Sequence, residues 1–277
     1  EQYNYAAVNF LQRPLEQWQV STMGHYEVKP GIEAYAQLFY TKKENEFQQA
    51  PEAVSPQSSG QESGTVLITN ADTNPLFPIA TRNFFSQNRA FFDPDGDGIF
   101  TVRGTQRRFE EFGPRNTSIT SDSFMLTGGL RGNLTLLDDD WKWDAFYQTS
   151  RSDVEFLQSN LLSRSRTTLG LDAVVVNGQV RCRNALLNCV PVNIFGTNTL
   201  TPQMVDFLSV DSGRSDEFSR DVAGATITGN LFALPAGDVA TAFGVEWRRE
   251  EFVTDPAEIA SDLASTPVPP LFNEGAF

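Results

Sequence analysis

Histidine and cysteine are almost absent from this chain of 277 residues, which contains only His25, Cys182 and Cys189. One imidazole and two cysteines this close together fit no zinc-binding pattern. A disulfide is the favoured interpretation of the cysteines and implies an oxidising compartment, and two free thiols are the alternative. His25 could act as a general base only with partners that the sequence does not identify.

Long apolar runs and an excess of positive charge are also missing. No stretch approaches the roughly 18 consecutive apolar residues of a membrane-spanning helix, although the alternating strands of a membrane barrel never produce such a run. The chain carries 35 acidic and 21 basic side chains, and its net charge of −14 argues against binding to nucleic acid. Because phosphate-loop, nucleophile-elbow and metal-hydrolase motifs are lacking too, we expect no enzyme, no catalytic residue and no required cofactor.

The sequence does contain six segments in which apolar and polar residues alternate, as in β-strands with one apolar face. In the first segment, Trp18, Val20 and Tyr26 share one face, and Gln19 and Glu27 share the other. The segments are longer than strands of soluble sheets, which average about five or six residues. We expect strands near residues 15–28, 32–43, 122–136, 141–153, 218–233 and 239–252.

Short turns and long connections follow one another along the chain. Turns near residues 29–31, 138–140 and 235–237 join the segments into three hairpins, and long outer loops are expected near residues 44–121, 154–217 and 253–277. Outer-membrane barrels have short periplasmic turns and long extracellular loops. The pattern predicts an all-β fold, a section of an antiparallel transmembrane β-barrel whose long extracellular loops contain short helices. A soluble β-sheet is the alternative.

The two faces of these segments differ in kind. The apolar face carries Trp18 and Trp247 toward the long loops and Tyr26 and Trp141 toward the short turns, as at the two interfaces of a lipid bilayer. Charges on the opposite face would be costly in a dry core but cost little beside water. We therefore expect that face to line a water-filled lumen, with the lumen-facing residues His25, Arg131, Asp144, Glu246 and Arg248.

One acidic turn in the first long loop is a candidate metal site. Asp93, Asp95 and Asp97 stand at alternate positions and are followed by Gly98, as carboxylates and glycine are in calcium-binding loops. The EF-hand pattern would need a glutamate at its twelfth position, which is Gly104 here. A Ca²⁺ site and an acidic surface turn both stay open.

An aromatic stretch before that turn is a candidate substrate-binding surface. Phe84, Phe85, Arg89 and Phe91 could stack against a sugar or a metal chelate, since loops carry function on a rigid scaffold. Packing of a loop helix against neighbouring loops is the favoured alternative.

Several motifs resemble those of TonB-dependent outer-membrane receptors. The periplasmic hairpin of that family is similar to residues 234–237 (LPAG) followed by residues 243–250 (FGVEWRRE). A loop segment of the family is similar to residues 189–196 (CVPVNIFG), with Cys182 where its partner cysteine would lie, and residues 200–203 (LTPQ) resemble the element that follows. In the first loop, residues 74–77 (NPLF) and 107–115 also look similar, so the resemblance covers nearly the whole chain.

The resemblance implies an active importer in the outer membrane of a Gram-negative bacterium. In that family a plug domain fills the barrel and the inner-membrane TonB complex supplies energy. The expected partners are outer-membrane lipid, a plug domain and TonB outside this segment, and a scarce nutrient such as a siderophore, vitamin or oligosaccharide. Plugged transporters have about 22 strands, so the chain is expected to be a mid-barrel fragment. The alternatives are a passive porin-type barrel and, less favoured, a secreted all-β carbohydrate-binding protein or enzyme.

Overall fold

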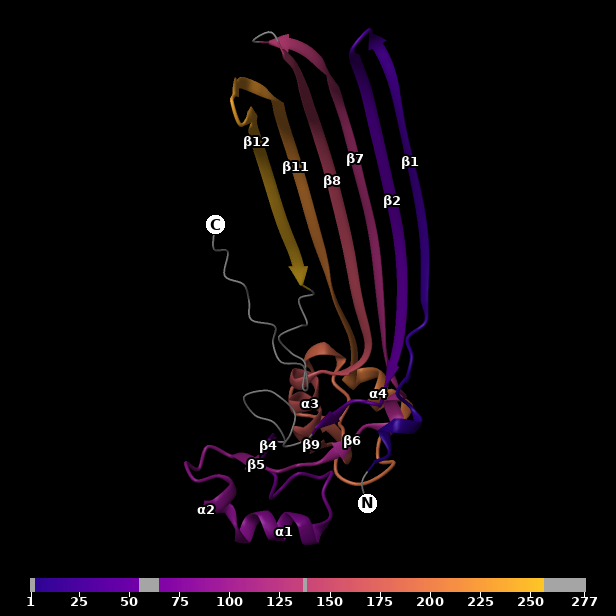
Figure 1. Ribbon diagram of the computed structural model, residues 1–277. Coiled ribbons are helices and arrows are strands. Elements are labelled where there is room, and N and C mark those ends of the chain that lie inside the picture. Colours follow the sequence, from indigo (N-terminus) through magenta and orange to yellow (C-terminus); the bar gives the residue numbers. More distant parts are fainter. Residues whose placement is uncertain (1–2, 55–64, 137–138, 257–277) are drawn as a thin grey trace.

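The computed structural model describes residues 3–54, 65–136 and 139–256 and is mostly antiparallel β, with 60% strand and 15% helix. Its main feature is a sheet of six long strands in the order β1-β2-β7-β8-β11-β12. Figure 1 shows these strands standing side by side above a compact region of helices and short strands. Their bounds are β1 Leu15–Lys29, β2 Ile32–Gln49, β7 Arg115–Leu136, β8 Asp139–Leu162, β11 Ser209–Leu234 and β12 Gly237–Pro256.

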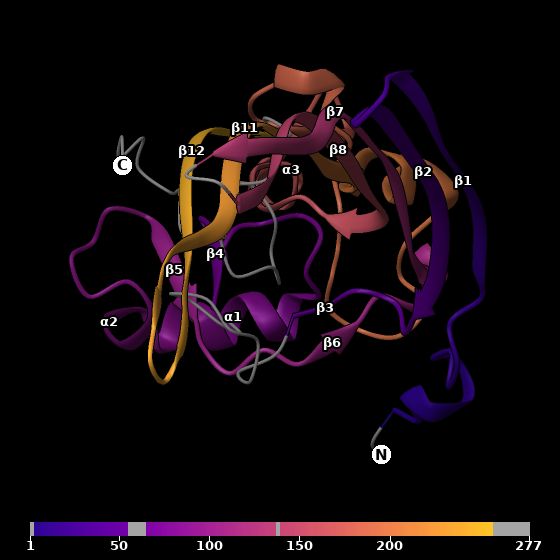
Figure 2. The same cartoon turned by 45° about the horizontal axis from the view of Figure 1, so that its top comes forward.

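The six-stranded sheet is curved but open. In the oblique view of Figure 2, with the short-turn end tilted forward, the sheet bends from β1 around to β12. Within the described residues, β1 pairs only with β2 and β12 pairs only with β11, so the sheet has two edges. Every residue of β1 is exposed, and so is every residue of β12 except the half-buried Val239 and Thr241. The structure therefore confirms an antiparallel all-β fold with six long strands in an open sheet, and that this sheet is a section of a transmembrane barrel stays a prediction.

The strands run further than the alternation in the sequence predicts. β7, β8 and β11 contain 22, 24 and 26 residues, whereas the expected strands covered residues 122–136, 141–153 and 218–233. β2 likewise continues to residue 49 and β12 to residue 256. Beyond the expected ends polar and charged residues occur on both faces, and the apolar residues no longer alternate regularly with them, so the ladder continues without the pattern that marks a strand in sequence.

The connections expected as loops at 44–121 and 154–217 are thus shorter, and they contain small elements of their own. The expected loop at 253–277 begins as part of β12, and residues 257–277 and Asp138 lie outside the described residues. The small strands are β3 Ala53–Val54, β4 Val66–Thr69, β5 Ile99–Val102, β6 Arg107–Arg108, β9 Ala173–Val176 and β10 Gln179–Cys182. The helices are η1 Tyr5–Ala7, α1 Ile79–Gln87, α2 Arg89–Phe92, η2 Glu110–Phe112, α3 Arg164–Leu171, η3 Leu186–Asn188 and α4 Pro202–Leu208.

The two connections pack against each other, and we call residues 50–54, 65–114 and 163–208 the loop cap. Its core joins Ile68 and Phe100 of the first connection to Leu171 and Val192 of the second, all fully buried. Among the buried polar contacts, the Asn74 side-chain amide donates to the Leu171 carbonyl oxygen at 2.5 Å. The largest apolar core of the described residues thus lies in the loop cap and not between the faces of the large sheet.

Arg107 links the two connections at a second place. Its guanidinium donates to the carbonyl oxygens of Ile194 and Gly196 at 2.6 and 2.5 Å and forms an ion pair of 2.6 Å with Glu111. Charge-assisted bonds from one fixed guanidinium orient several backbone groups at once. The loop cap is therefore held by polar contacts as well as by its apolar core. Among the described residues, no helix combines the length and apolar character needed to span a membrane.

Two phenylalanines of the first connection differ completely in burial, so their substitutions test the packing of the core of the loop cap. Phe100 is 0% exposed and Phe91 is 80% exposed. Phe100→Ala should destabilise the loop cap by about 3–5 kcal/mol, since it leaves a cavity, and Phe91→Ala should change stability by less than about 0.5 kcal/mol. Urea titration followed by limited proteolysis of the loop cap measures both. Equal sensitivity of the two variants would contradict the packing described.

Candidate functional site

Strand register divides the large sheet into two faces. His25, Tyr35, Gly129, Phe146, Gly224 and Glu246 form one row of directly paired residues across all six strands. Side chains of directly paired residues lie on the same face, and so do those two positions away on each strand. The five residues expected to face a lumen, His25, Arg131, Asp144, Glu246 and Arg248, therefore share one face. We call it the charged face, and that it lines a lumen stays a prediction.

A cross-strand network forms on the charged face between β2, β7 and β8. Glu33 and Arg131 form an ion pair at 2.5 Å, and the Tyr35 hydroxyl donates to the Asp144 carboxylate at 3.1 Å. The Arg131 guanidinium lies 5.2 Å from the centre of the Tyr35 ring. Exposed contacts of this kind contribute little stability each. Their effect is to fix the directions of a carboxylate, a guanidinium and a phenol on the charged face.

Glu33 and Tyr35 were not among the site residues expected from the sequence. Their place in the alternation puts them on the same face as Arg131. The choice of Arg131 and Asp144 as their partners depends on the register between three strands, and alternation within one strand does not specify it.

Two hollows of the large sheet lie on the charged face. The larger has a volume of about 480 Å³ and lies toward the short turns, and the smaller measures about 230 Å³. The larger is lined from this face by Glu27, Glu33, Arg131, Lys142, Asp144 and Thr226, and the smaller by Phe39, Thr41, Ser123, Met125, Ser150 and Phe218. The hollows offer mixed charges, hydroxyl groups and a few aromatic rings to a polar solute.

The opposite face is apolar over a limited length of every strand, and we call this band the apolar stripe. On β7 it runs over Phe124, Leu126, Leu130 and Leu134, with glycines between them. Each strand contributes five to seven consecutive same-face positions without a charge, on residues 18–28, 32–40, 124–136, 141–149, 223–231 and 239–247. Most large side chains of the stripe are well exposed, Val245 and Trp18 by 71% and 73%. Soluble monomers rarely expose a continuous apolar area of this size.

The edge of the apolar stripe is inclined to the strands. Going away from the short turns, the first charged residues on this face are Glu16, Lys42, Asp122, Arg151, Asp221 and Arg249, in strand order. By register, the edge moves six residues from β1 to β12, from Glu16 to the row of Thr22. Six residues are roughly 20 Å along a strand, and five strand spacings are roughly 24 Å across. The edge is therefore inclined by about 40° to the rows of paired residues.

Trp141 behaves differently from the other aromatic residues of the apolar stripe. It is only 2% exposed, because its indole lies over Gly229 of β11, where a side chain would collide with the ring. The expected aromatic residue at the short-turn end is thus present on the expected face but packed against the sheet.

The aromatic candidates of the first connection fall into two groups. Phe85 is buried, and its ring centre lies 5.2 Å from that of Phe92 and 5.7 Å from that of Phe100. Arg89 forms ion pairs with two aspartates. Phe84 and Phe91 are exposed. The packing interpretation therefore describes Phe85, whereas Phe84 and Phe91 contact the ring of Phe92 and keep an exposed side.

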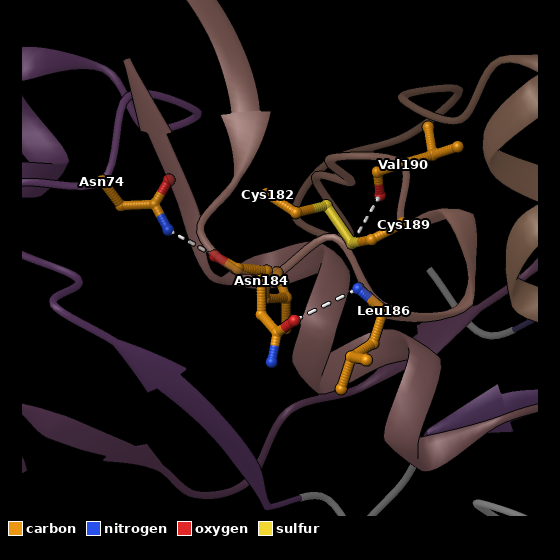
Figure 3. The surroundings of a disulfide bond; sticks show 7 residues. Asn74, Cys182, Asn184, Leu186, Cys189 and Val190 are labelled. Atoms are coloured by element: carbon orange, nitrogen blue, oxygen red, sulfur yellow. Dashed lines mark hydrogen bonds between the residues drawn. A yellow bond between two sulfur atoms is a disulfide. The ribbon is translucent and has the colours of Figure 1, made fainter. Parts of the chain in front are cut away.

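Cys182 and Cys189 form a disulfide in the second connection, with their Cα atoms 6.1 Å apart (Figure 3). The enclosed segment begins after β10 and includes η3, where the Leu186 amide donates to the Asn184 side chain at 3.1 Å. Val190, the residue after Cys189, packs against the apolar core of the loop cap. The disulfide thus closes a small surface loop beside the core of the loop cap.

The three aspartates of the acidic turn come together. Asp93, Asp95 and Asp97 each place an oxygen within 4.8 Å of the others. Asp93 is buried directly after α2, and the other two are exposed before β5. All three aspartates belong to the loop cap, which lies at the end of the molecule opposite the short turns (Figure 1).

Comparison with known proteins does not assign a family. No protein-family model, no curated protein and no solved structure matches the chain. The resemblance to TonB-dependent receptors therefore stays a prediction from the motifs.

Proposed function

We propose that this chain is a section of the wall of an outer-membrane transporter, which imports a scarce nutrient with energy from the TonB complex. The observation that carries the proposal is the apolar stripe. A single band without charges crosses six strands on one face, while the opposite face carries charged residues such as Glu33, Arg131 and Asp144 over the same length of the strands. Hydrocarbon against the stripe and water against the charged face satisfy both surfaces.

The dimensions of the stripe support a bilayer as its partner. Five to seven alternate positions span eight to twelve residues, roughly 26–40 Å along the strand, which is roughly 20–30 Å in height for strands tilted by about 40°, and barrel proteins carry an outward apolar band about 25 Å tall. Barrel strands are tilted by about 35–45°. The edge of the stripe is inclined by about 40° to the rows of paired residues, so strands with that tilt would hold it level with a membrane surface.

The distribution of the connections supports the same orientation. Turns of a few residues join β1 to β2, β7 to β8 and β11 to β12, and all lie at one end of the sheet. The loop cap lies at the other end, beyond strand sections that are charged on both faces. In an outer-membrane protein the short turns face the periplasm and the long connections face outside. The loop cap would then meet the external solution and the nutrient first.

Active import rests on the motifs. The turn of residues 234–237 (LPAG) joins β11 to β12, where the family has its periplasmic hairpin. The partners of the proposal are outer-membrane lipid, a plug domain and TonB, and a small molecule such as a siderophore, vitamin or oligosaccharide. A passive porin-type barrel shares the wall and the stripe, so energy dependence separates the two.

If the apolar stripe contacts lipid, a charged side chain should destabilise the protein within the stripe but not beyond its edge on the same face. Leu126→Arg in the middle of the stripe should cost about 2–4 kcal/mol, because the guanidinium would enter hydrocarbon. Thr120→Arg is the matched control, since Thr120 lies on the same face of β7 but pairs with Glu44 and Glu155 beyond the stripe. Urea titration of the intact gene product folded into lipid vesicles measures both variants. Equal stabilities would contradict contact between the stripe and lipid.

The transport part is tested by uptake in living cells. A strain that lacks the gene should lose growth on its limiting nutrient and regain it with the intact gene. Collapse of the inner-membrane proton gradient or removal of the TonB complex should abolish the uptake, because passage past a plug requires energy. Uptake that continues without either would identify a passive barrel.

A further inference from the structure

We propose that the acidic turn of the loop cap is a Ca²⁺ site formed by Asp93, Asp95 and Asp97. Ca²⁺ binds oxygen ligands at 2.3–2.6 Å, so two ligands on one ion lie at most about 5 Å apart. The three carboxylates meet this condition, with oxygens within 4.8 Å of one another. The site goes beyond the proposed transport function and does not depend on it.

An unpaired buried oxygen gives independent support. The Asp93 side chain is 0% exposed. Its Oδ2 accepts bonds from Arg89 and from the Gly98 amide at 3.1 and 3.2 Å, whereas its Oδ1 has no hydrogen-bond partner among the described residues. A buried carboxylate oxygen without a partner is costly. A cation beside Oδ1 supplies the missing interaction.

The surrounding charges also favour a cation. Arg89 is shared between Asp93 and Asp72, with contacts of 2.9 and 3.0 Å. Asp95 and Asp97 form no ion pair among the described residues, so Arg89 neutralises only part of the negative charge here. Arg89 approaches Asp93 on Oδ2, which leaves Oδ1 to a second positive charge. The exposed positions of Asp95 and Asp97 admit water to the same ion.

The ligand chemistry selects Ca²⁺ among common metals. All three side chains are hard oxygen donors, and both cysteines are joined in a disulfide far along the chain, so zinc and copper lack their preferred ligands. Mg²⁺ demands a nearly ideal octahedron and dehydrates reluctantly, whereas Ca²⁺ accepts irregular mixtures of carboxylate and water.

The turn follows the first half of an EF-hand loop and lacks the second half. Asp93, Asp95 and Asp97 occupy the first, third and fifth positions, and Gly98 at the sixth has a φ of +88° that favours glycine. Gly104 stands where the bidentate glutamate would be. With fewer charged ligands, the dissociation constant should fall near 10⁻⁴–10⁻³ M, the range of extracellular calcium modules.

The test is calorimetric titration of the full chain in detergent with CaCl₂ after removal of metal by a chelator. The unaltered chain should bind one Ca²⁺ saturably at about 10⁻⁴–10⁻³ M. The double variant Asp95→Asn/Asp97→Asn should weaken binding at least tenfold. These two exposed residues are chosen because Asp93 also holds Arg89 and the Gly98 amide, and its loss could prevent folding.

Asp139→Asn/Asp140→Asn is the control, since it removes the same charge at a short turn at the other end of the sheet. It should bind Ca²⁺ as the unaltered chain does, and circular dichroism should show all three chains equally folded. No saturable heat from the folded chain, equal binding by the Asp95/Asp97 variant, or equal affinity for Mg²⁺ would overturn the assignment. Because the readout is ion binding, it is independent of uptake.

Discussion

The pairing register of the six long strands is the constraint on which the rest depends. It carries alternate side chains of each strand onto the same face as those of its neighbours, from His25 on β1 to Glu246 on β12. A slip of one residue in any pair would move that strand's Leu or Trp residues among the charges and its Arg or Glu residues into the apolar stripe. The separation of apolar and charged side chains onto two faces is therefore a property of the sheet and not of any single strand.

The loop cap is stabilised by burial of apolar side chains, unlike the large sheet. The large sheet has little apolar core between its faces, so the long connections bury their phenylalanines against each other. Arg107 and the Asn74 amide then join chain segments that are distant in sequence, and the disulfide closes a small loop within the second connection. A packed cap at the ends of long strands can hold exposed groups such as Phe84 and Phe91 in place.

Alternation predicts where strands exist and which residues share a face, because a two-residue period directly reflects the geometry of a strand. It does not predict strand ends, since Thr120 and its partners Glu44 and Glu155 stay paired in the sheet beyond the apolar stripe, where the alternation has ended. Local sequence also cannot separate Phe85 from Phe91, because burial depends on Phe100 of another element. The spacing of Asp93, Asp95 and Asp97 suggests a cation, but the unpaired oxygen of Asp93 becomes visible only after folding.

Site-directed spin labelling along β7 in lipid vesicles tests the central claim most directly. Nitroxides at successive positions from 117 to 134 report collisions with oxygen, which concentrates in lipid, and with a water-soluble nickel complex. We expect alternation between the two from 124 to 134, with the oxygen maxima at the even-numbered positions, which include Phe124, Leu126, Leu130 and Leu134, and access to nickel at every position from 118 to 122. Nickel access at Leu126 and Leu130 equal to that at Thr127 would contradict it.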